Sequence, residues 1–290
     1  MIKKLILLLI SLIAIAYAQS HKEELALLGN VKNLVVEEEV AGLEPVLINS
    51  YDFDESGNLI KSVVLSYDLD NNLRFKIISY YENDVIIKQE KYSPSGDLVN
   101  YSEYIYDDNG NILKQLSYSP EGVVKHKRIY NYENGLVKTE DLYSAETLTR
   151  RYINEYDADG NRINRKRYDI NGVLDQERIY DIVLNTYKEI GYNSDGEVVS
   201  RAFGQYDKKG RIIKSTAYTM DGSIQTESGW IYDNKGLLTK EELVVAGDNA
   251  EFVYDYEFDE QGNWISRTVS EIVDGEPLKL ETIVRTIEYY

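Results

Sequence analysis

The chain has 290 residues, with 32 basic and 50 acidic side chains, a formal net charge of −18 and no cysteine. The lack of cysteine excludes disulfides, thiolate metal sites and a cysteine nucleophile, and His21 and His126 are too few for a histidine-rich metal site. The acidic balance disfavours nucleic acid and anionic membrane surfaces as partners, because both attract basic proteins. A hydrophobic fraction of 43% with only 4 prolines predicts a folded chain.

Residues 1–18 have the pattern of a signal peptide. Lys3 and Lys4 precede an apolar run from Leu5 to Ala16, and the small residues around Tyr17 predict cleavage after Ala18. The run is shorter than the roughly 20 residues that cross a bilayer, so we expect no stable membrane span after cleavage. The sequence therefore predicts a bacterial protein exported to the periplasm, the cell surface or the medium. A retained N-terminal anchor is the alternative.

Aromatic residues repeat along the rest of the chain with a period of about 25 residues. A second set lies between the members of the first and divides each repeat into two halves. The first set is Phe53, Tyr80, Tyr106, Tyr132, Tyr156, Tyr180, Tyr206, Tyr232 and Phe258, and the second is Tyr67, Tyr92, Tyr118, Tyr143, Tyr168, Tyr192 and Tyr218.

Each aromatic is followed by a polar turn, usually with glycine four residues on, as in Tyr106-Asp107-Asp108-Asn109-Gly110. This composition is typical of hairpin loops built on a type I turn. The stretches between turns are about seven or eight residues long and rich in Val, Ile, Thr and Tyr, which predicts strands. Because such short connections join antiparallel neighbours, the sequence predicts an all-β antiparallel meander built from two-strand repeats.

The aromatic pairs of this meander should share one face of the sheet. Side chains two residues apart point the same way, so Tyr104 and Tyr106, like Tyr130 and Tyr132, are expected to form aromatic columns with each hydroxyl reaching water or a backbone partner. Because sheets twist, we expect one long twisted or coiled sheet with an aromatic face inside, as an open spiral or a partly closed shell. A straight two-sided ribbon is the alternative.

The Tyr-Asp-x-x-Gly-Asn/Arg turns, with the aliphatic pair that follows them, resemble the YD repeats of the RHS/YD-repeat superfamily. The chain is especially similar to short secreted bacterial YD-repeat proteins of unknown function, over about residues 50–265. The resemblance implies a continuous antiparallel sheet that coils, which in the large toxin members forms a shell around a toxic cargo domain. This chain has a longer period than the family's roughly 20 residues and no appended cargo domain, so the toxin role is not expected.

The predicted organisation follows from these patterns. Residues 1–18 form the signal peptide, 19–50 an N-terminal cap region, 51–270 the YD-repeat β-sheet domain and 271–290 the C-terminal capping strands. A short helix is expected between His21 and Leu28, and Glu241 to Glu251 are expected to form an irregular insertion.

Candidate binding residues are few. Trp230 and Trp264 occur in only some copies of the repeat, so they are better candidates for stacking on a glycan than the regular tyrosines, which we expect to hold the sheet together. Asp157 and Asp159 share Asp-x-Asp-Gly with calcium loops, but the bidentate glutamate of such a loop is missing. Turn chemistry is the favoured interpretation, with weak calcium binding left open.

A group of basic residues could form a stripe if its strands lie side by side. Acidic residues lie among them, so cross-strand ion pairs are favoured over an anion-binding groove. The basic residues are Lys125, His126, Lys127, Arg128, Arg150, Arg151, Arg162, Arg165, Lys166 and Arg167, and the acidic ones are Glu133, Glu140, Asp141, Glu146 and Glu155.

No catalytic motif is present in the sequence: there is no Gly-x-Ser-x-Gly, His-Glu-x-x-His, phosphate loop or dinucleotide fingerprint. We therefore predict no enzyme, catalytic residue, cofactor or metal, although a glycosidase carboxylate pair stays open. The favoured function is an exported scaffold that binds an unidentified protein or glycan through an extended sheet surface. Alternatives are a glycan-binding or adhesive surface protein, and an outer-membrane β-barrel, which the basic residues scattered through the strands disfavour.

Overall fold

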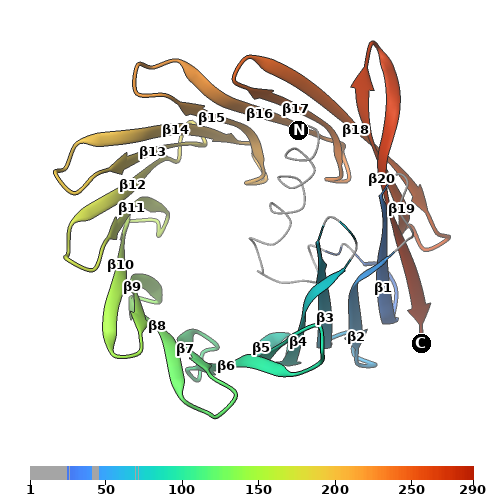
Figure 1. The fold of residues 1–290 in the computed structure, drawn as a ribbon, viewed down its shortest axis with the longest axis horizontal. Coiled ribbons are helices and arrows are strands. Elements are labelled where there is room, and N and C mark those ends of the chain that lie inside the picture. Colours follow the sequence, from blue (N-terminus) through green and yellow to red (C-terminus); the bar gives the residue numbers. More distant parts are fainter. Residues whose placement is uncertain (1–24, 26, 41–45, 69, 71) are drawn as a thin grey trace.

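The computed structural model describes residues 25, 27–40, 46–68, 70 and 72–290, which contain one 20-stranded antiparallel sheet (Figure 1). Strands adjacent in sequence pair with each other, which confirms the predicted all-β meander. The first strand also pairs with the last, so the sheet closes into a barrel. The predicted signal peptide lies outside the described residues, as does most of the expected helix.

All strands but β20 have 7 to 11 residues, and tight turns join them where the structure describes the connection. In chain order they are β1 (Val31–Val40), β2 (Val46–Phe53), β3 (Leu59–Tyr67), β4 (Leu73–Glu82), β5 (Val85–Tyr92), β6 (Leu98–Tyr106), β7 (Ile112–Tyr118), β8 (Val124–Glu133), β9 (Leu136–Ser144), β10 (Thr147–Tyr156), β11 (Arg162–Tyr168), β12 (Leu174–Asp181), β13 (Thr186–Tyr192), β14 (Val198–Tyr206), β15 (Ile212–Tyr218), β16 (Ile224–Tyr232), β17 (Leu238–Val245), β18 (Asp248–Phe258), β19 (Trp264–Val273) and β20 (Glu276–Tyr289).

Closure corrects the expectation of a long twisted or coiled sheet. β1 lies in the region expected to cap the sheet, and it pairs with β20 in a register that places Val35 opposite Thr286. The wall therefore has no free edge between these two strands, which removes the need for a covering segment. With neighbouring strands about 4.8 Å apart, twenty of them enclose a ring with a radius of roughly 15 Å before strand tilt is counted.

The turns have the predicted chemistry. In the turn after β6, Asp107 Oδ1 accepts hydrogen bonds from the backbone N–H groups of Asn109 and Asn111 at 2.9 and 2.8 Å, and Gly110 N–H donates to Asp107 O at 3.0 Å. Gly110 has a φ of 80°, which glycine adopts without steric cost. The segment from Glu241 to Glu251 was expected to be irregular, and this expectation is wrong, because it forms β17 and β18 around a tight turn at Ala246 and Gly247.

The two aromatic sets lie near opposite ends of the barrel. The first set precedes the connections that follow even-numbered strands, and we call this end the first rim; the second set precedes the connections of the second rim. Tyr106, Tyr132 and Tyr156 share the inner face, and their hydroxyls donate to the carbonyls of Ile86, Ile112 and Val137 at 2.7, 2.9 and 2.9 Å. These backbone partners explain why tyrosine replaces phenylalanine in the columns.

The apolar core lies on the inner face, on both sides of the closing seam. One cluster joins β1 to β4, where Leu34 is fully buried beside Phe53, Leu59 and Tyr81. The other centres on Phe252 of β18 and Val269 of β19. Hydrophobic packing therefore concentrates where the first and last strands of the chain meet. No helix among the described residues is long and apolar enough to cross a membrane.

Candidate functional site

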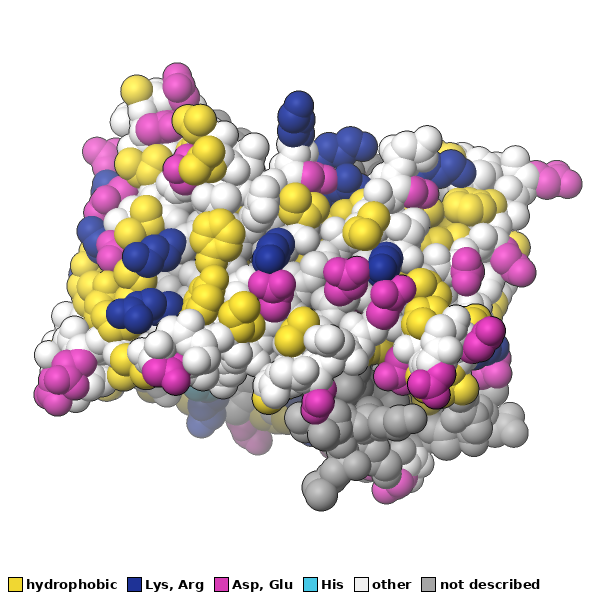
Figure 2. Space-filling model, turned by 90° about the horizontal axis from the view of Figure 1, so that it is seen from above, with side chains coloured by type: hydrophobic (Ala, Val, Ile, Leu, Met, Phe, Trp, Pro, Cys, Tyr) yellow, Lys and Arg dark blue, Asp and Glu magenta, His cyan; other side chains and the backbone are white. Residues whose placement is uncertain are grey.

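Ion pairs lie on the outer surface of the barrel. They occur along the length of the strands and not only at the strand ends. Figure 2 shows basic and acidic side chains lying among hydrophobic ones on one side of this wall. The outer pairs are Lys88–Glu90 and Arg151–Asp141 at 2.7 Å, Lys166–Glu155 at 2.8 Å, and Lys214–Glu227 and Lys240–Glu251 at 3.0 Å.

A second set of charges lines the inner wall. Glu140 forms an ion pair with Arg128 at 3.4 Å and accepts a hydrogen bond from Arg165 at 3.1 Å, and the Arg165 guanidinium lies 4.2 Å from the centre of the Tyr152 ring. Burial alone would lower the pKa of Arg128, but hydrogen bonding to Tyr130 and the nearby Glu140 charge outweigh it and raise that pKa. The predicted cross-strand ion pairs are confirmed, but they lie on both faces and do not form one stripe.

The two tryptophans singled out by the sequence are packed against charged neighbours. The Arg285 guanidinium lies 3.4 Å from the centre of the Trp264 ring, and Tyr256 meets that ring edge-on at 5.9 Å. Trp230 pairs across strands with Glu241 and hydrogen-bonds to it. Burial raises the pKa of Glu241, and its bonds from Tyr254 and Trp230 oppose this rise. The role of these tryptophans as ligand-binding residues stays a prediction.

Asp157, one of the two aspartates considered for calcium binding, makes the hydrogen bonds of an ordinary turn. Asp157 Oδ1 accepts from the backbone N–H groups of Asp159 and Asn161 at 3.0 and 2.8 Å, and Oδ2 accepts from the Asn161 side chain at 3.0 Å. These bonds, the one from the Asn161 side chain foremost, lower the pKa of Asp157. The described part of the chain contains no group of three His, Cys, Asp or Glu residues placed to hold a metal. Weak calcium binding at Asp157 and Asp159 stays a prediction.

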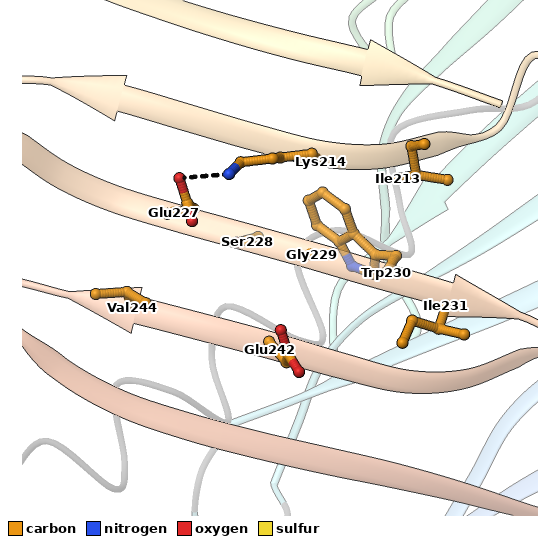
Figure 3. Close-up of a pocket in the computed structure, with 9 residues that line it drawn as sticks. All are labelled: Ile213, Lys214, Glu227, Ser228, Gly229, Trp230, Ile231, Glu242 and Val244. Atoms are coloured by element: carbon orange, nitrogen blue, oxygen red, sulfur yellow. Dashed lines mark ion pairs between the residues drawn. The ribbon is translucent and has the colours of Figure 1, made fainter.

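A shallow hollow of about 270 Å³ opens over Gly229 of β16 (Figure 3). The strands of the opposite wall lie behind it in this view, so the hollow is on the outer surface. It exists because glycine leaves a gap between Lys214 and Glu242, its cross-strand neighbours. Its lining residues are Ile213, Lys214, Glu227, Ser228, Gly229, Trp230, Ile231, Glu242 and Val244.

A second pocket, of about 310 Å³, lies at the first rim and is called the rim pocket here. It lies where β11, β12, β13 and β14 follow one another around the barrel (Figure 1). Two tyrosine rings and several planar polar side chains contribute to it. Its lining residues are Arg162, Tyr180, Asp181, Ile182, Asn185, Thr186, Tyr206 and Gly210.

Two departures from the repeat meet at the rim pocket. Arg162 is the first residue of β11, a position held by leucine or isoleucine at the start of β3, β7, β15 and β17. The connection from Asp181 to Asn185 replaces the Asp-x-x-Gly turn by an apolar loop without glycine, closed by a 3.0 Å bond from Leu184 N–H to Asp181. This site was not predicted from the sequence, although both departures are visible in the repeat.

The Tyr180 hydroxyl also departs from the pattern of its set. Tyr132 and Tyr232 donate to the first carbonyl of the preceding strand, at Ile112 and Ile212. In the rim pocket, Arg162 Nη2 donates to the Tyr180 hydroxyl at 3.1 Å, and the Arg162 guanidinium lies 5.1 Å from the centre of the Tyr180 ring. The arginine therefore sets the position of this ring.

The second ring of the rim pocket, that of Tyr206, packs against the buried Tyr187. Tyr187, only 7% exposed, lies over Gly204 of the neighbouring strand, where a Cβ atom would come within 1.9 Å of the Tyr187 ring. Tyr187 packs against Tyr206 with ring centres 5.7 Å apart, and Arg178 covers its other side at 4.5 Å. A backbone hydrogen bond from Tyr206 N–H to Asn185 O at 2.7 Å joins the Tyr206 backbone to the loop. The rim pocket is thus held in shape before any ligand arrives.

Comparison with known proteins gives no family. No family model matches the chain, and no curated protein matches it. Among solved structures, the chain is similar to a porin-like protein from Bacteroides uniformis, with 13% identity, 89% of this chain and 98% of that chain covered, and a TM-score of 0.39.

Two further solved structures have lower scores. A TcdB2–TccC3–Cdc42 complex gives 12% identity and a TM-score of 0.23, with 86% of this chain but 19% of that chain covered. A protein of unknown function from Bacteroides fragilis gives 13% identity and a TM-score of 0.19, with 61% of this chain and 96% of that chain covered. Scores this low do not indicate a common fold, so the barrel is described from the strand pairing of this chain.

Proposed function

We propose that the protein is an exported, non-enzymatic binding protein that works as a closed barrel in water. The observation that carries this proposal is the set of outer-wall ion pairs, such as Lys166–Glu155 and Lys214–Glu227, within the strands. Facing water, such pairs are close to neutral in free energy. Facing lipid, one basic side chain at the middle of a bilayer costs about 2–4 kcal/mol, and this wall carries several.

Fractionation of bacteria that express the full chain tests the proposal. We expect the mature protein in the periplasmic or culture fraction, and a single monodisperse species by size exclusion without detergent. Protein that stays with the membrane pellet after carbonate washing and needs detergent for release would contradict the proposal. N-terminal sequencing of the same sample tests the predicted cleavage after Ala18.

The second candidate function is an outer-membrane β-barrel. An even number of antiparallel strands in a closed sheet is the architecture of such proteins, and outward tyrosines such as Tyr92, Tyr118 and Tyr192 near the second rim resemble one aromatic girdle. The two candidates differ in their behaviour with lipid. Flotation of the purified protein with phosphatidylcholine vesicles through a density gradient favours the membrane barrel, and protein left at the bottom favours the soluble one.

Membership of the RHS/YD-repeat superfamily stays a proposal that rests on the turn motifs. The repeat geometry supports it, because each Tyr-Asp-x-x-Gly segment forms a hairpin turn between paired strands. A binding role is compatible with this architecture. Regular hairpins build the wall, so single side chains and loops can differ between repeats and form a binding site.

A further inference from the structure

We propose that the rim pocket binds a neutral saccharide unit of a glycan. This inference rests on the proposed binding function and names its ligand class. The pocket brings the rings of Tyr180 and Tyr206 together with the planar polar groups of Arg162, Asp181 and Asn185. A sugar ring has apolar C–H faces that pack on aromatic rings, and hydroxyls that both donate and accept hydrogen bonds, so this combination matches it.

The polar groups of the pocket favour a neutral ligand. Arg162 supplies donors and Asp181 supplies acceptors, and their formal charges cancel. Asp181 Oδ1 is engaged by Leu184 N–H, which fixes the orientation of the carboxylate and leaves its Oδ2 lone pairs for a hydroxyl. An anionic ligand would gain from Arg162 but would be repelled by Asp181, whereas a hydroxylated neutral one gains from both.

The size and placement of the pocket suit one sugar ring of a longer chain. A volume of about 310 Å³ is near the lower end of the range of roughly 300–1,000 Å³ for small-molecule sites. The loop beside it projects into solvent, with Val183 90% and Leu184 65% exposed. A pocket at a rim, beside a projecting apolar loop, leaves both ends of a glycan chain free to continue.

The repeat itself identifies this pocket as a departure from the structural pattern. Arg162 replaces an aliphatic residue and the Asp181 to Asn185 loop replaces a glycine turn, although both ordinary versions occur elsewhere in this barrel. Two departures that a regular wall does not need converge on one cavity. Locally irregular positions in a regular repeat are where a binding function is expected.

Calorimetric titration of the purified full chain with four trisaccharides tests the inference. The probes are maltotriose, cellotriose, mannotriose and tri-N-acetylchitotriose, each up to millimolar concentration. We expect saturable binding of at least one of them. No detectable heat with any of the four, confirmed by unchanged tyrosine fluorescence, would overturn the inference.

Matched variants locate the binding. Tyr180→Leu and Asp181→Asn are each expected to weaken the affinity for the bound trisaccharide about tenfold. Tyr232→Leu is the control, because Tyr232 belongs to the same aromatic set and carries Arg211 over its ring at 4.4 Å, but lies outside the rim pocket. Unchanged binding by both pocket variants, or an equal loss in the control, would overturn the inference.

The outcomes separate this inference from the proposed function. Asp181→Asn keeps an acceptor for Leu184 N–H, so it reports on the ligand even if Tyr180→Leu fails to fold. A soluble exported barrel that binds none of the probes contradicts the saccharide site alone. A protein that requires detergent contradicts the soluble barrel, and the same titration in detergent still tests the pocket.

Discussion

The inner and outer faces of this barrel are built from the same strands but use charge differently. Glu140 and its neighbour Asp141 on β9 illustrate the contrast. Glu140 points inward and is shared by Arg128 and Arg165, whereas Asp141 points outward and pairs with Arg151 alone. Both carboxylates are buried, but Asp141 is satisfied by two hydrogen bonds from the single guanidinium of Arg151, whereas the inner charges form networks with tyrosine rings.

The aromatic residues follow the same division. Inner tyrosines of the first set anchor to carbonyls of the preceding strand, as Tyr106 does to Ile86. Outer ones pack on each other, as Tyr101 and Tyr118 do with ring centres 4.8 Å apart. The comparison indicates that the inner tyrosines tie neighbouring strands together through backbone carbonyls, while the outer ones contact each other across strands.

Two glycines on opposite faces give the largest expected contrast. Gly204→Ala would place a Cβ atom within 1.9 Å of the buried Tyr187 ring, so we expect a loss of about 3 kcal/mol. Gly229→Ala on the outer face meets no atom closer than 3.9 Å and is expected to be neutral or slightly stabilising. Thermal melting of both variants measures the difference. Equal melting temperatures would contradict the proposed difference between the inner and outer faces.

The neighbouring carboxylates on β9 give a smaller contrast. Glu140→Gln removes the shared charge between Arg128 and Arg165, and we expect a loss of about 2 kcal/mol. Asp141→Asn removes a bidentate pair with Arg151, and because the Asp141 side chain is only 7% exposed we expect a loss of about 1–2 kcal/mol, less than at Glu140 because only one arginine loses its partner. Urea denaturation compares the two, and a larger effect at Asp141 would reverse the proposed division.

A turn variant tests the account of the rims. Gly110→Val should cost about 1–2 kcal/mol, because a β-branched residue is strained at a φ of 80°. A Cβ atom at this position would have no neighbouring atom within 4 Å, so the effect reports backbone strain alone. A melting temperature equal to that of the wild type would show that the turn assignment is wrong.

The seam between β1 and β20 is expected to depend on pH. Burial and the neighbouring Glu281 raise the pKa of Glu38 from 4.5 to about 7, with Arg267 opposing the rise. The folded state therefore binds more protons than the unfolded state between these values, so this group destabilises the fold increasingly as pH rises through the window. Glu38→Gln should raise the melting temperature at pH 8 and leave it nearly unchanged at pH 4. A larger gain at pH 4 would contradict the assignment.

Local sequence patterns predict the strands and turns well, because each depends on residues within one hairpin. The position of Gly110 after Asp107 and the shared face of Tyr106, Tyr132 and Tyr156 are examples. Closure could not be predicted in the same way. It depends on pairing between residues 31–40 and 276–289, which are far apart in sequence and carry no local signal for each other.

The candidate site was predicted less well than the fold. Residue type drew attention to Trp230 and Trp264, but tryptophans in a wall are also good packing residues, and here they contact Glu241 and Arg285. The rim pocket depends on Arg162 and the loop after Asp181, which come together only when β11 and β12 pair. Departures from the repeat would have been the better signal.

Barrel closure is the central claim, and an engineered disulfide tests it most directly. The natural chain has no cysteine, so Val35→Cys with Thr286→Cys introduces one possible pair, between residues that lie opposite each other in β1 and β20. We predict complete oxidation in the folded protein and faster migration on a non-reducing gel. Val35→Cys with Val253→Cys is the control and should remain reduced. A first pair that stays reduced, or oxidation to the same extent in both, would contradict a closed barrel.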